Sequence, residues 1–479
     1  MKKQFLFLCL FLVNIVANAQ KTLDDKSFIS NQLDQKYNAY RQVAKQIWGY
    51  AELGYLESKS SALLQDVLKK EGFSVQSGVA EIPTAFVASY GSGKPVIGIL
   101  AEFDALPGLS QDSLPYKKPL IEGGTGHGCG HNLFGTASVA AAVALKDWLI
   151  QSKKAGTVRL YGTPAEEGGG GKIYMVRAGM FNDVDGVLHW HPGDGNNADA
   201  STCLAVMQGN FRFYGKTAHA AAAPDKGRSA LDGIEAMNNM VNLMREHVDE
   251  KSRIHYVILK GGLAANVVPD FAETEYMVRH PNVAETKAIW ERVIKAAEGA
   301  ALGTGTTMKF EVTNGLYEIL PNETLGKVMH ANLERVGGVI YTPDELVFAN
   351  KIRESFDGKL PPLSRASEVA PFKVGYFPAS SDVGDISYLV PTAALNTATW
   401  IPGTAAHTWQ AVAADGMSIG YKAMINAAKT IAMSGADLFN NPTILVKAKE
   451  ELMQKRGADF QYKPLIGDRK PPLDYRKGM

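Results

Sequence analysis

Apolar residues follow a helical period in some segments of the chain and form short continuous runs in others. The segment 63–72 places its apolar side chains on one face of a helix that ends at Gly72, and the Ala-rich segment 137–150 is a strongly apolar helix. Short apolar runs between turn residues predict strands at 84–90, 96–101, 157–161 and 184–190. Strands that alternate with helices predict a mostly parallel sheet covered on both faces.

The order of the predicted elements changes between residues 208 and 314. It becomes strand, helix, strand, strand, helix, strand, which is the βαββαβ order of a ferredoxin-like unit. The predicted segments are 210–214, 229–247, 253–260, 271–279, 284–300 and 307–312. The simplest architecture is an α/β domain that is interrupted by this smaller inserted domain.

The rest of the chain completes the larger domain. We expect a helix near 325–336, a long proline-containing loop at 341–379, a strand at 392–399 and a helix from Ala411. The predicted domains are 20–207 together with 315–446 for the α/β domain, 208–314 for the inserted domain, and 447–479 for a C-terminal surface arm.

The first 19 residues differ in pattern from the rest and predict a signal peptide. Lys2 and Lys3 precede an apolar stretch that ends at Val16, and Ala17 and Ala19 supply the small residues that a signal peptidase needs. The stretch is shorter than the roughly 20 apolar residues that span a bilayer. We therefore expect export to the periplasm or the medium. No later segment is apolar for long enough to span a membrane, so no membrane partner is expected after cleavage.

Composition excludes several classes of protein. The chain has 479 residues, 46% of them hydrophobic, with 50 Lys and Arg against 49 Asp and Glu. This is ordinary globular composition, which excludes disordered, collagen-like and coiled-coil classes. A net charge of +1 argues against nucleic acid as a partner. Cys129 and Cys203 remain after signal cleavage, and in an exported protein they could form a disulfide.

The glycine-rich segment 126–132 suggests different chemistry for Cys129. It contains His127, Cys129 and His131 just before a helix, without the apolar alternation of a core segment. Thiolate and imidazole are good ligands for zinc and similar ions. Because a Cys-Gly-His triplet alone is weak evidence, the metal site depends on ligands from elsewhere in the chain.

A pair of carboxylates supplies the first of these. Glu166 and Glu167 end a buried strand and precede four glycines, Gly168–Gly171, that allow a sharp turn. Two such carboxylates can divide the work, one binding metal and the other taking a proton. A phosphate-binding loop is rejected, because Glu166 stands at its first glycine and Ile173 replaces its hydroxyl residue.

Histidines follow at two further places. His189 and His191 end the next strand and share one face of it, so both could approach one site and one of them could stand behind the other. His407 lies at a strand-to-helix junction far along the chain. A single histidine at such a junction is more often structural, and only the other ligands favour a role in the site.

Taken together, these motifs resemble those of a known family. The motifs that carry the likeness are Glu102–Gly108, Gly128–Asn132, Pro164–Gly168, Trp190–Gly193, Gly215–Ala220, Asn266–Pro269 and Ser380–Asp385. Their order is similar to that of the dinuclear-metal amidohydrolases and peptidases, which include aminoacylases, carboxypeptidase G-type enzymes and plant auxin-conjugate hydrolases. Asn132, where many members have Asp, is shared with the aminobenzoyl-glutamate utilisation branch. The resemblance implies a zinc-exopeptidase-like metal-binding domain with an inserted lid that dimerises.

The resemblance also implies roles for individual residues. Two divalent ions, zinc or manganese, are expected on a set of five ligands: Cys129, His131, Glu167, His191 and His407. Glu166 is expected to be the general base. Asp104 is expected to orient an imidazole, and His127 and His189 stand outside the ligand set.

The inserted domain is expected to contribute to the site as well. By resemblance, His219 and Asn266 reach it, His219 from the partner subunit of a homodimer or of a heterodimer with a homologue. There they would hold the oxyanion or a substrate carboxylate. Arg279 is a candidate clamp for that carboxylate or, equally, a salt-bridge partner at a strand end.

The expected reaction is hydrolysis of an amide bond in a small N-acyl amino acid, with p-aminobenzoyl-glutamate as one substrate of this type. Two alternatives remain open. One is a dipeptidase for basic or β-amino dipeptides, and the other is a non-catalytic partner subunit on the same fold. The presence of both Glu166 and Glu167 argues against the non-catalytic subunit.

Overall fold

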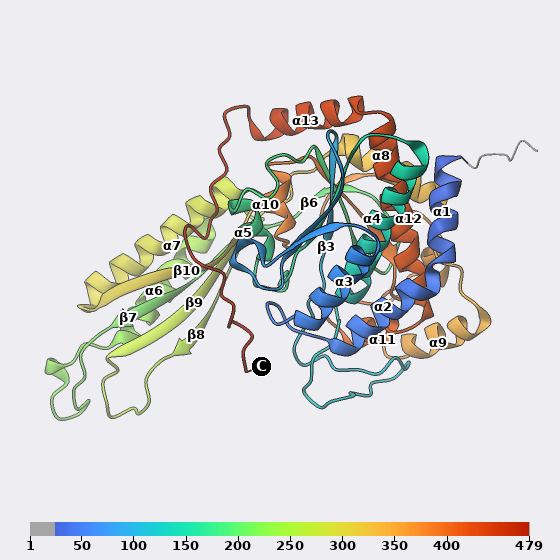
Figure 1. Cartoon of the computed structure of the whole chain (residues 1–479). Coiled ribbons are helices and arrows are strands. Elements are labelled where there is room, and N and C mark those ends of the chain that lie inside the picture. Colours follow the sequence, from blue (N-terminus) through green and yellow to red (C-terminus); the bar gives the residue numbers. More distant parts are fainter. Residues whose placement is uncertain (1–23, 479) are drawn as a thin grey trace, which may run out of the picture.

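Two large sheets organise residues 24–478, which are the residues that the computed structural model describes (Figure 1). The predicted signal peptide, residues 1–19, lies outside the described residues. The larger sheet has the strand order β1-β2-β4-β3-β5-β12, in which β4, β3, β5 and β12 run parallel to one another and β2 pairs antiparallel with both β4 and β1. Its strands are β1 Ser74–Ser77, β2 Phe86–Ser92, β3 Val96–Ala101, β4 Gly156–Gly162, β5 Gly186–Gly193 and β12 Thr392–Ala398. The mostly parallel sheet of the α/β class is confirmed.

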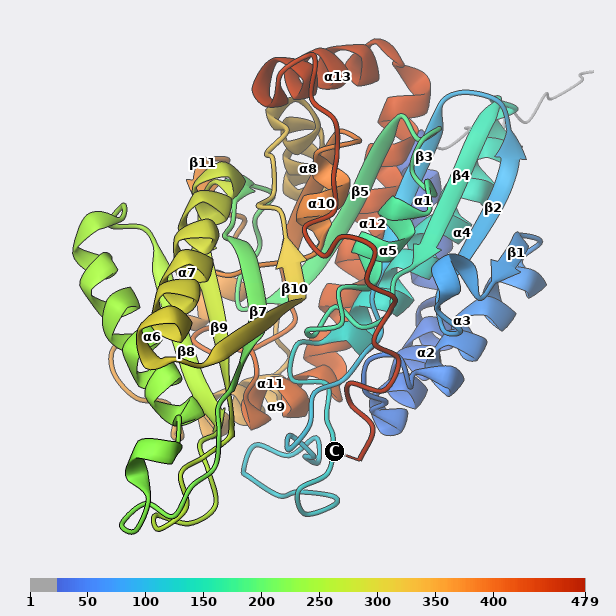
Figure 2. The same cartoon turned by 90° about the vertical axis from the view of Figure 1, so that its left-hand side faces the viewer.

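Helices cover both faces of this sheet (Figure 2). On β3, Ile97 and Ile99 pack into the core that α4 and α12 cover, whereas Leu100 packs into the core beside α5. Burial on both faces explains why β3 is a continuous apolar run. The helices of this domain are α1 Asp25–Gln35, α2 Tyr37–Tyr50, α3 Ser58–Lys70, α4 His131–Ser152, α5 Gly171–Arg177, α8 Glu323–Val336, α9 Pro343–Arg353, α10 Val383–Ser387, α11 Trp409–Asp415, α12 Ser418–Asn440 and α13 Thr443–Arg456.

The second large sheet has the strand order β10-β7-β9-β8, and all its neighbours are antiparallel. Phe211, Tyr276 and Trp290 pack in a separate core between this sheet and its helices. The elements are β7 Ala205–Tyr214, α6 Ala230–Met244, β8 Arg253–Lys260, β9 Phe271–His280, α7 Val283–Thr304 and β10 Thr307–Leu316. The predicted βαββαβ order is confirmed, and we call this unit the lid. It projects from the larger domain in Figure 1.

The prediction of a loop over 341–379 is wrong for the first part of this segment, because α9 lies within it. Thr342 and Glu345 form a capping box, and Pro343 stands in the first turn, where its missing N–H costs no hydrogen bond. A short strand, β11 Val374–Tyr376, follows and pairs in parallel with β6 Ala200–Thr202. The helix expected from Ala411 is two helices, α11 and α12, with Gly416 between them.

One helix among the described residues, α4, is long and apolar enough to cross a membrane by length and composition, which differs from the expectation. It lies at the centre of the larger domain, and 89% of its most apolar window is buried inside the molecule. Helix α4 is therefore the main core helix against which the sheet and α12 pack.

The chain after α13 turns back across the larger domain. Figure 2 shows it running from α13 past β10 and α5 to the C-terminus. Ile466 is 6% exposed and packs into the core beside α5. The C-terminal arm is thus part of the packed structure rather than only a surface extension.

Candidate metal centre

The carboxyl ends of β3, β4 and β5 bring the candidate side chains together. Asp104 follows β3, Glu167 follows β4, and His191 lies in the last part of β5. The segment after β12 adds His407. Because parallel strands end at one edge of the sheet, residues far apart in sequence meet there.

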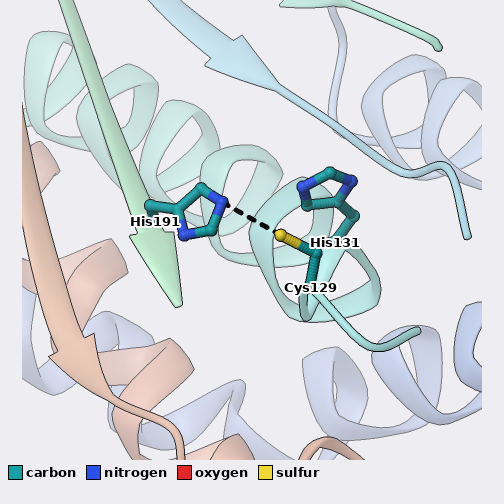
Figure 3. A group of neighbouring side chains, drawn as sticks. All are labelled: Cys129, His131 and His191. Carbon is teal, nitrogen blue, oxygen red and sulfur yellow. Dashed lines mark hydrogen bonds between the residues drawn. The ribbon is translucent and has the colours of Figure 1, made fainter. Parts of the chain in front are cut away.

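The first group consists of Cys129, His131 and His191, drawn in Figure 3. Their ligand atoms lie within 4.8 Å of one another, and Sγ of Cys129 is 3.4 Å from Nε2 of His191. His131 is the first residue of α4, and Gly130 before it has a φ of 75°. A side chain at Gly130 would also come within 2.7 Å of Pro192, so glycine is required for the loop to approach β5.

Hydrogen bonds to the other ring nitrogen orient both histidines. Nδ1 of His131 is 2.9 Å from Oδ1 of Asp104, and Nδ1 of His191 is 2.8 Å from the carbonyl oxygen of Pro192. Since a carboxylate and a carbonyl only accept, each Nδ1 carries a proton, which leaves Nε2 of each ring as the atom that faces the group. This arrangement is typical of histidines that ligate metal.

A second group consists of Cys129, Glu167 and His407. Nε2 of His407 lies 3.1 Å from Oε1 of Glu167, and its backbone N–H donates to the carbonyl of Gly128. This hydrogen bond with Glu167 raises the pKa of His407. Burial alone would raise the pKa of Glu167, but the hydrogen bond from His407 and the nearby His131 lower it overall. Cys129 belongs to both groups, so the five expected ligands form one continuous cluster.

Glu102 is a further carboxylate at the site, for which the sequence motifs predicted no role. It forms a third group with His131 and Glu166, and its Oε2 is 3.1 Å from Nε2 of His131. Its other oxygen is 2.8 Å from Nζ of Lys172, a fully buried lysine that also lies 2.6 Å from Asp382. The signal in the sequence was its position two residues before Asp104, directly after a buried strand.

The donor set fits divalent metal ions. Nε2 of His131 is buried and forms no hydrogen bond, and the carboxylate of Glu102 faces it at 3.1 Å. Burial raises the pKa of the Cys129 thiol well above its usual value, a cost that a bound cation would offset by favouring the thiolate. Thiolate, imidazole and carboxylate together suit zinc and similar ions. Cys129 and Cys203 are both free and buried, so the disulfide alternative is not what the structure has.

The turn that carries Glu166 and Glu167 is fixed by two buried carboxylates. Asp104 accepts a hydrogen bond from the backbone N–H of Glu167 at 2.9 Å. Glu57 accepts one from the N–H of Ala165 at 2.8 Å, and Ala165 has a left-handed φ of 57°. No motif in the sequence indicated Glu57, because its link to the turn is made only by the fold.

Glu166 has the electrostatic setting of a proton acceptor. Burial, and then the negative charges of Glu102 and Glu167, raise its pKa well above the usual value of a carboxyl group. A carboxyl group with a raised pKa binds a proton more strongly, which favours general-base chemistry near neutral pH.

The two histidines left out of the ligand set have other surroundings. His127 directs Nε2 to the carbonyl of Ile47 at 3.0 Å. The ring of His189 stacks on Phe134, with 6.4 Å between the ring centroids. Burial lowers the pKa of His127 to about 4 and that of His189 to about 3, so both rings are neutral. Neither occurs in a group of candidate ligands among the described residues.

The lid residues are not brought to the cluster within one chain. His219 and Asn266 are exposed and lie in the loops that follow β7 and β8. Figure 1 shows these loops at the end of the lid that is far from the larger domain, which we call its free end. Nδ1 of His219 accepts hydrogen bonds from the N–H groups of Ala221 and Ala222. Arg279 donates to Sδ of Met277, and no carboxylate in residues 24–478 lies within ion-pair distance of it. The salt-bridge alternative for Arg279 is therefore not present.

Comparisons with known proteins show what the chain is similar to. A model of the peptidase family M20/M25/M40 matches residues 98–341. The chain is 40% identical over 454 residues to one of the subunits of the p-aminobenzoyl-glutamate hydrolase of Escherichia coli, with 89% of this chain and 94% of the relative covered. It is 28% identical over 449 residues to the Xaa-Arg dipeptidase of Mus musculus, with 89% and 91% covered. A dinuclear metal-binding peptidase from Bacillus subtilis shares the fold, with a TM-score of 0.60 and 18% identity over 85% of this chain and 99% of that chain.

Proposed function

Because the chain belongs to the peptidase family M20/M25/M40, we propose that it hydrolyses the amide bond of p-aminobenzoyl-glutamate or a closely similar N-acyl amino acid. It is a metal-dependent hydrolase of the amidohydrolase and peptidase type. The observation that carries the proposal is that Glu166 lies beside a cluster of thiol, imidazole and carboxylate donors. The relative in Escherichia coli, which is named as a hydrolase subunit, supports it.

The metal ligands in this proposal are the five clustered residues, Cys129, His131, Glu167, His191 and His407. They would hold two divalent ions, zinc or manganese. When bound, such ions polarise the scissile carbonyl and lower the pKa of the attacking water. Asp104 keeps His131 in the tautomer that presents Nε2, and it holds the backbone of Glu167 in place.

Glu166 performs the proton transfer. Its carboxylate takes a proton from the attacking water and delivers it to the nitrogen of the departing amine, so the base of the first step is the acid of the second. General acid–base groups of this kind contribute about 10²–10⁴ in rate. The raised pKa of Glu166 suits it to both halves of this exchange.

The lid completes the site from a second subunit. Exposed His219 at the free end of one lid would stabilise the oxyanion in the partner's site, and Asn266 and Arg279 would bind the substrate carboxylate. Burial lowers the pKa of Arg279, but an arginine remains charged at neutral pH. We propose a homodimer. The relative in Escherichia coli is named as one subunit of its hydrolase, which supports a heterodimer with a homologue as the second arrangement.

We also propose that the enzyme works outside the cytoplasm. The apolar stretch from Phe5 to Val16 and the small residues before Gln20 support this location. N-terminal sequencing of the protein recovered from the periplasm or medium should begin at Gln20. Recovery of the unprocessed chain in the cytoplasm would contradict it.

A dipeptidase acting on basic or β-amino dipeptides is the second candidate function, supported by the similarity to the Xaa-Arg dipeptidase. A product assay separates the two candidates. Purified residues 20–479, supplied with zinc or manganese, should release glutamate from p-aminobenzoyl-glutamate faster than lysine from β-alanyl-lysine, and a chelator should abolish the reaction. The reverse preference would favour the dipeptidase, and a metal-loaded protein that hydrolyses neither would favour a non-catalytic subunit.

Removal of the shared thiol should show up in metal content. The reconstituted protein should carry close to two equivalents of divalent ion, and Cys129→Ala should carry clearly less, because Cys129 belongs to both ligand groups. Elemental analysis after gel filtration measures this. Cys203→Ala is the matched control, since it removes a buried free thiol outside these groups. Equal metal content in the two variants would remove Cys129 from the site.

A further inference from the structure

The C-terminal arm reaches the turn that carries the two catalytic carboxylates. The hydroxyl of Tyr475 donates a hydrogen bond to the backbone carbonyl of Glu167 at 3.0 Å, and Nη2 of Arg476 donates to the same oxygen at 2.9 Å. These residues lie 308 and 309 positions after Glu167 in the sequence. Two donors on one carbonyl hold the peptide plane that follows Glu167.

The backbone N–H of Glu167 has a fixed partner as well. Asp104 accepts from the N–H of Glu167, so both backbone polar groups of this expected metal ligand have fixed partners. The next residue, Gly168, is exposed and has a φ of 91°. Because glycine adopts many backbone conformations, this residue does not by itself restrict the orientation of the turn. The orientation of the Glu167 side chain therefore depends on Asp104 and the arm together.

The protein makes specific room for Tyr475. A Cβ atom at Gly54 would lie 2.2 Å from the Tyr475 hydroxyl, so only glycine admits it. The ring of Tyr475 packs edge-on against Tyr55, with 5.6 Å between centroids, and Tyr55 donates to the carbonyl of Gly169 at 2.7 Å. The arm and the segment before α3 thus both hydrogen-bond the glycine turn.

Further contacts anchor the arm before it reaches the turn. Nη1 of Arg177 on α5 donates to the carbonyls of Gly467 and Arg469 at 2.9 and 2.7 Å. Nη1 of Arg469 donates to the carbonyls of Val312 and Thr313 on β10, the strand by which the chain leaves the lid. These contacts fix the path of the arm between the lid and the cluster, so Tyr475 and Arg476 arrive at a defined place.

We propose that Tyr475 and Arg476 are positioning residues of the active site, which act by holding the Glu167 carbonyl and thereby the carboxylate that binds metal. The inference rests on the proposed function for the role of Glu167, and it makes the last residues of the chain part of the catalytic machinery. Outer partners of metal ligands typically contribute about 10–100-fold to metal affinity or activity.

The test compares four variants with the full chain. Tyr475→Phe removes only the hydroxyl, Arg476→Ala removes the guanidinium, Arg476→Lys keeps a donor, and a chain ending at Lys470 removes both residues. The first two should lower zinc affinity and kcat about tenfold, and the shortened chain up to about 100-fold, with KM little changed. Arg476→Lys should recover part of the loss. Zinc affinity is measured by chelator competition, without substrate.

Lys477→Ala is the matched control, because it removes a neighbouring exposed cation, and it should keep wild-type affinity and rate. Thermal unfolding of each variant separates a local effect from loss of folding. Zinc affinity and kcat unchanged in Tyr475→Phe and in the shortened chain would overturn the inference, as would a rise in KM alone. If the full chain binds zinc but hydrolyses no substrate, the proposed function fails, while zinc affinity still decides the role of the arm.

Discussion

Glu166→Ala should keep its metal and lose about 10²–10⁴ in kcat, because the variant lacks the group that moves the proton while the five clustered ligands remain. Glu166→Gln should behave in the same way, since an amide keeps the shape of the side chain but does not take a proton from water. Metal content by elemental analysis and kcat at saturating substrate are measured on the same preparations.

Glu167→Ala is the informative comparison for this result. Glu167 lies 3.1 Å from His407 and shares a group with Cys129, so its removal should lower metal content as well as rate. The two neighbouring carboxylates should therefore differ in metal binding although both variants are nearly inactive. If Glu166→Ala lost as much metal as Glu167→Ala, the assignment of Glu166 as base would be mistaken.

His219→Ala should leave folding and metal content unchanged and lower hydrolysis by about 10²–10³, the loss typical of one oxyanion donor. The side chain is exposed at the free end of the lid, and it has no contact with the cluster of its own chain in residues 24–478. A partner subunit is the usual way to bring such a residue to a site.

Mixing experiments show which chain His219 serves. When His219→Ala and Glu166→Ala subunits are mixed, activity should return to at most about a quarter of wild type, because half of the dimers are mixed and each has one intact site. Lys216→Ala is a control in the same loop, exposed and outside the assigned site. Full activity of His219→Ala would remove it from the reaction. A verified mixed dimer that stays inactive would place His219 in the site of its own chain.

Local patterns in the sequence were sufficient for the lid, for most strands of the larger sheet and for the candidate residues of the cluster. The strand β3 and the βαββαβ order of the lid could be predicted because burial leaves a pattern in the sequence. A strand that is buried on both faces is a continuous apolar run, whereas an element that is buried on one face has apolar residues at regular intervals. Cys129, His131, Glu167, His191 and His407 were noticeable as candidates because they stand in glycine-rich turns or at strand ends, but only the resemblance to a family joined them into one ligand set. The helix α9 was missed, because Pro343 was interpreted without the capping box around it.

Only the tertiary structure decided which distant groups support the cluster. Glu57, Glu102 and Lys172 are buried charged residues whose partners lie on other elements, and a single charged residue in a sequence does not indicate its partner. The contact between the C-terminal arm and Glu167 is of the same kind. The sequence by itself therefore determined most strands, the element order of the lid and the candidate metal ligands, whose signals are local. The fold alone determined how those side chains are held, because backbone hydrogen bonds between remote segments leave no periodic or compositional trace.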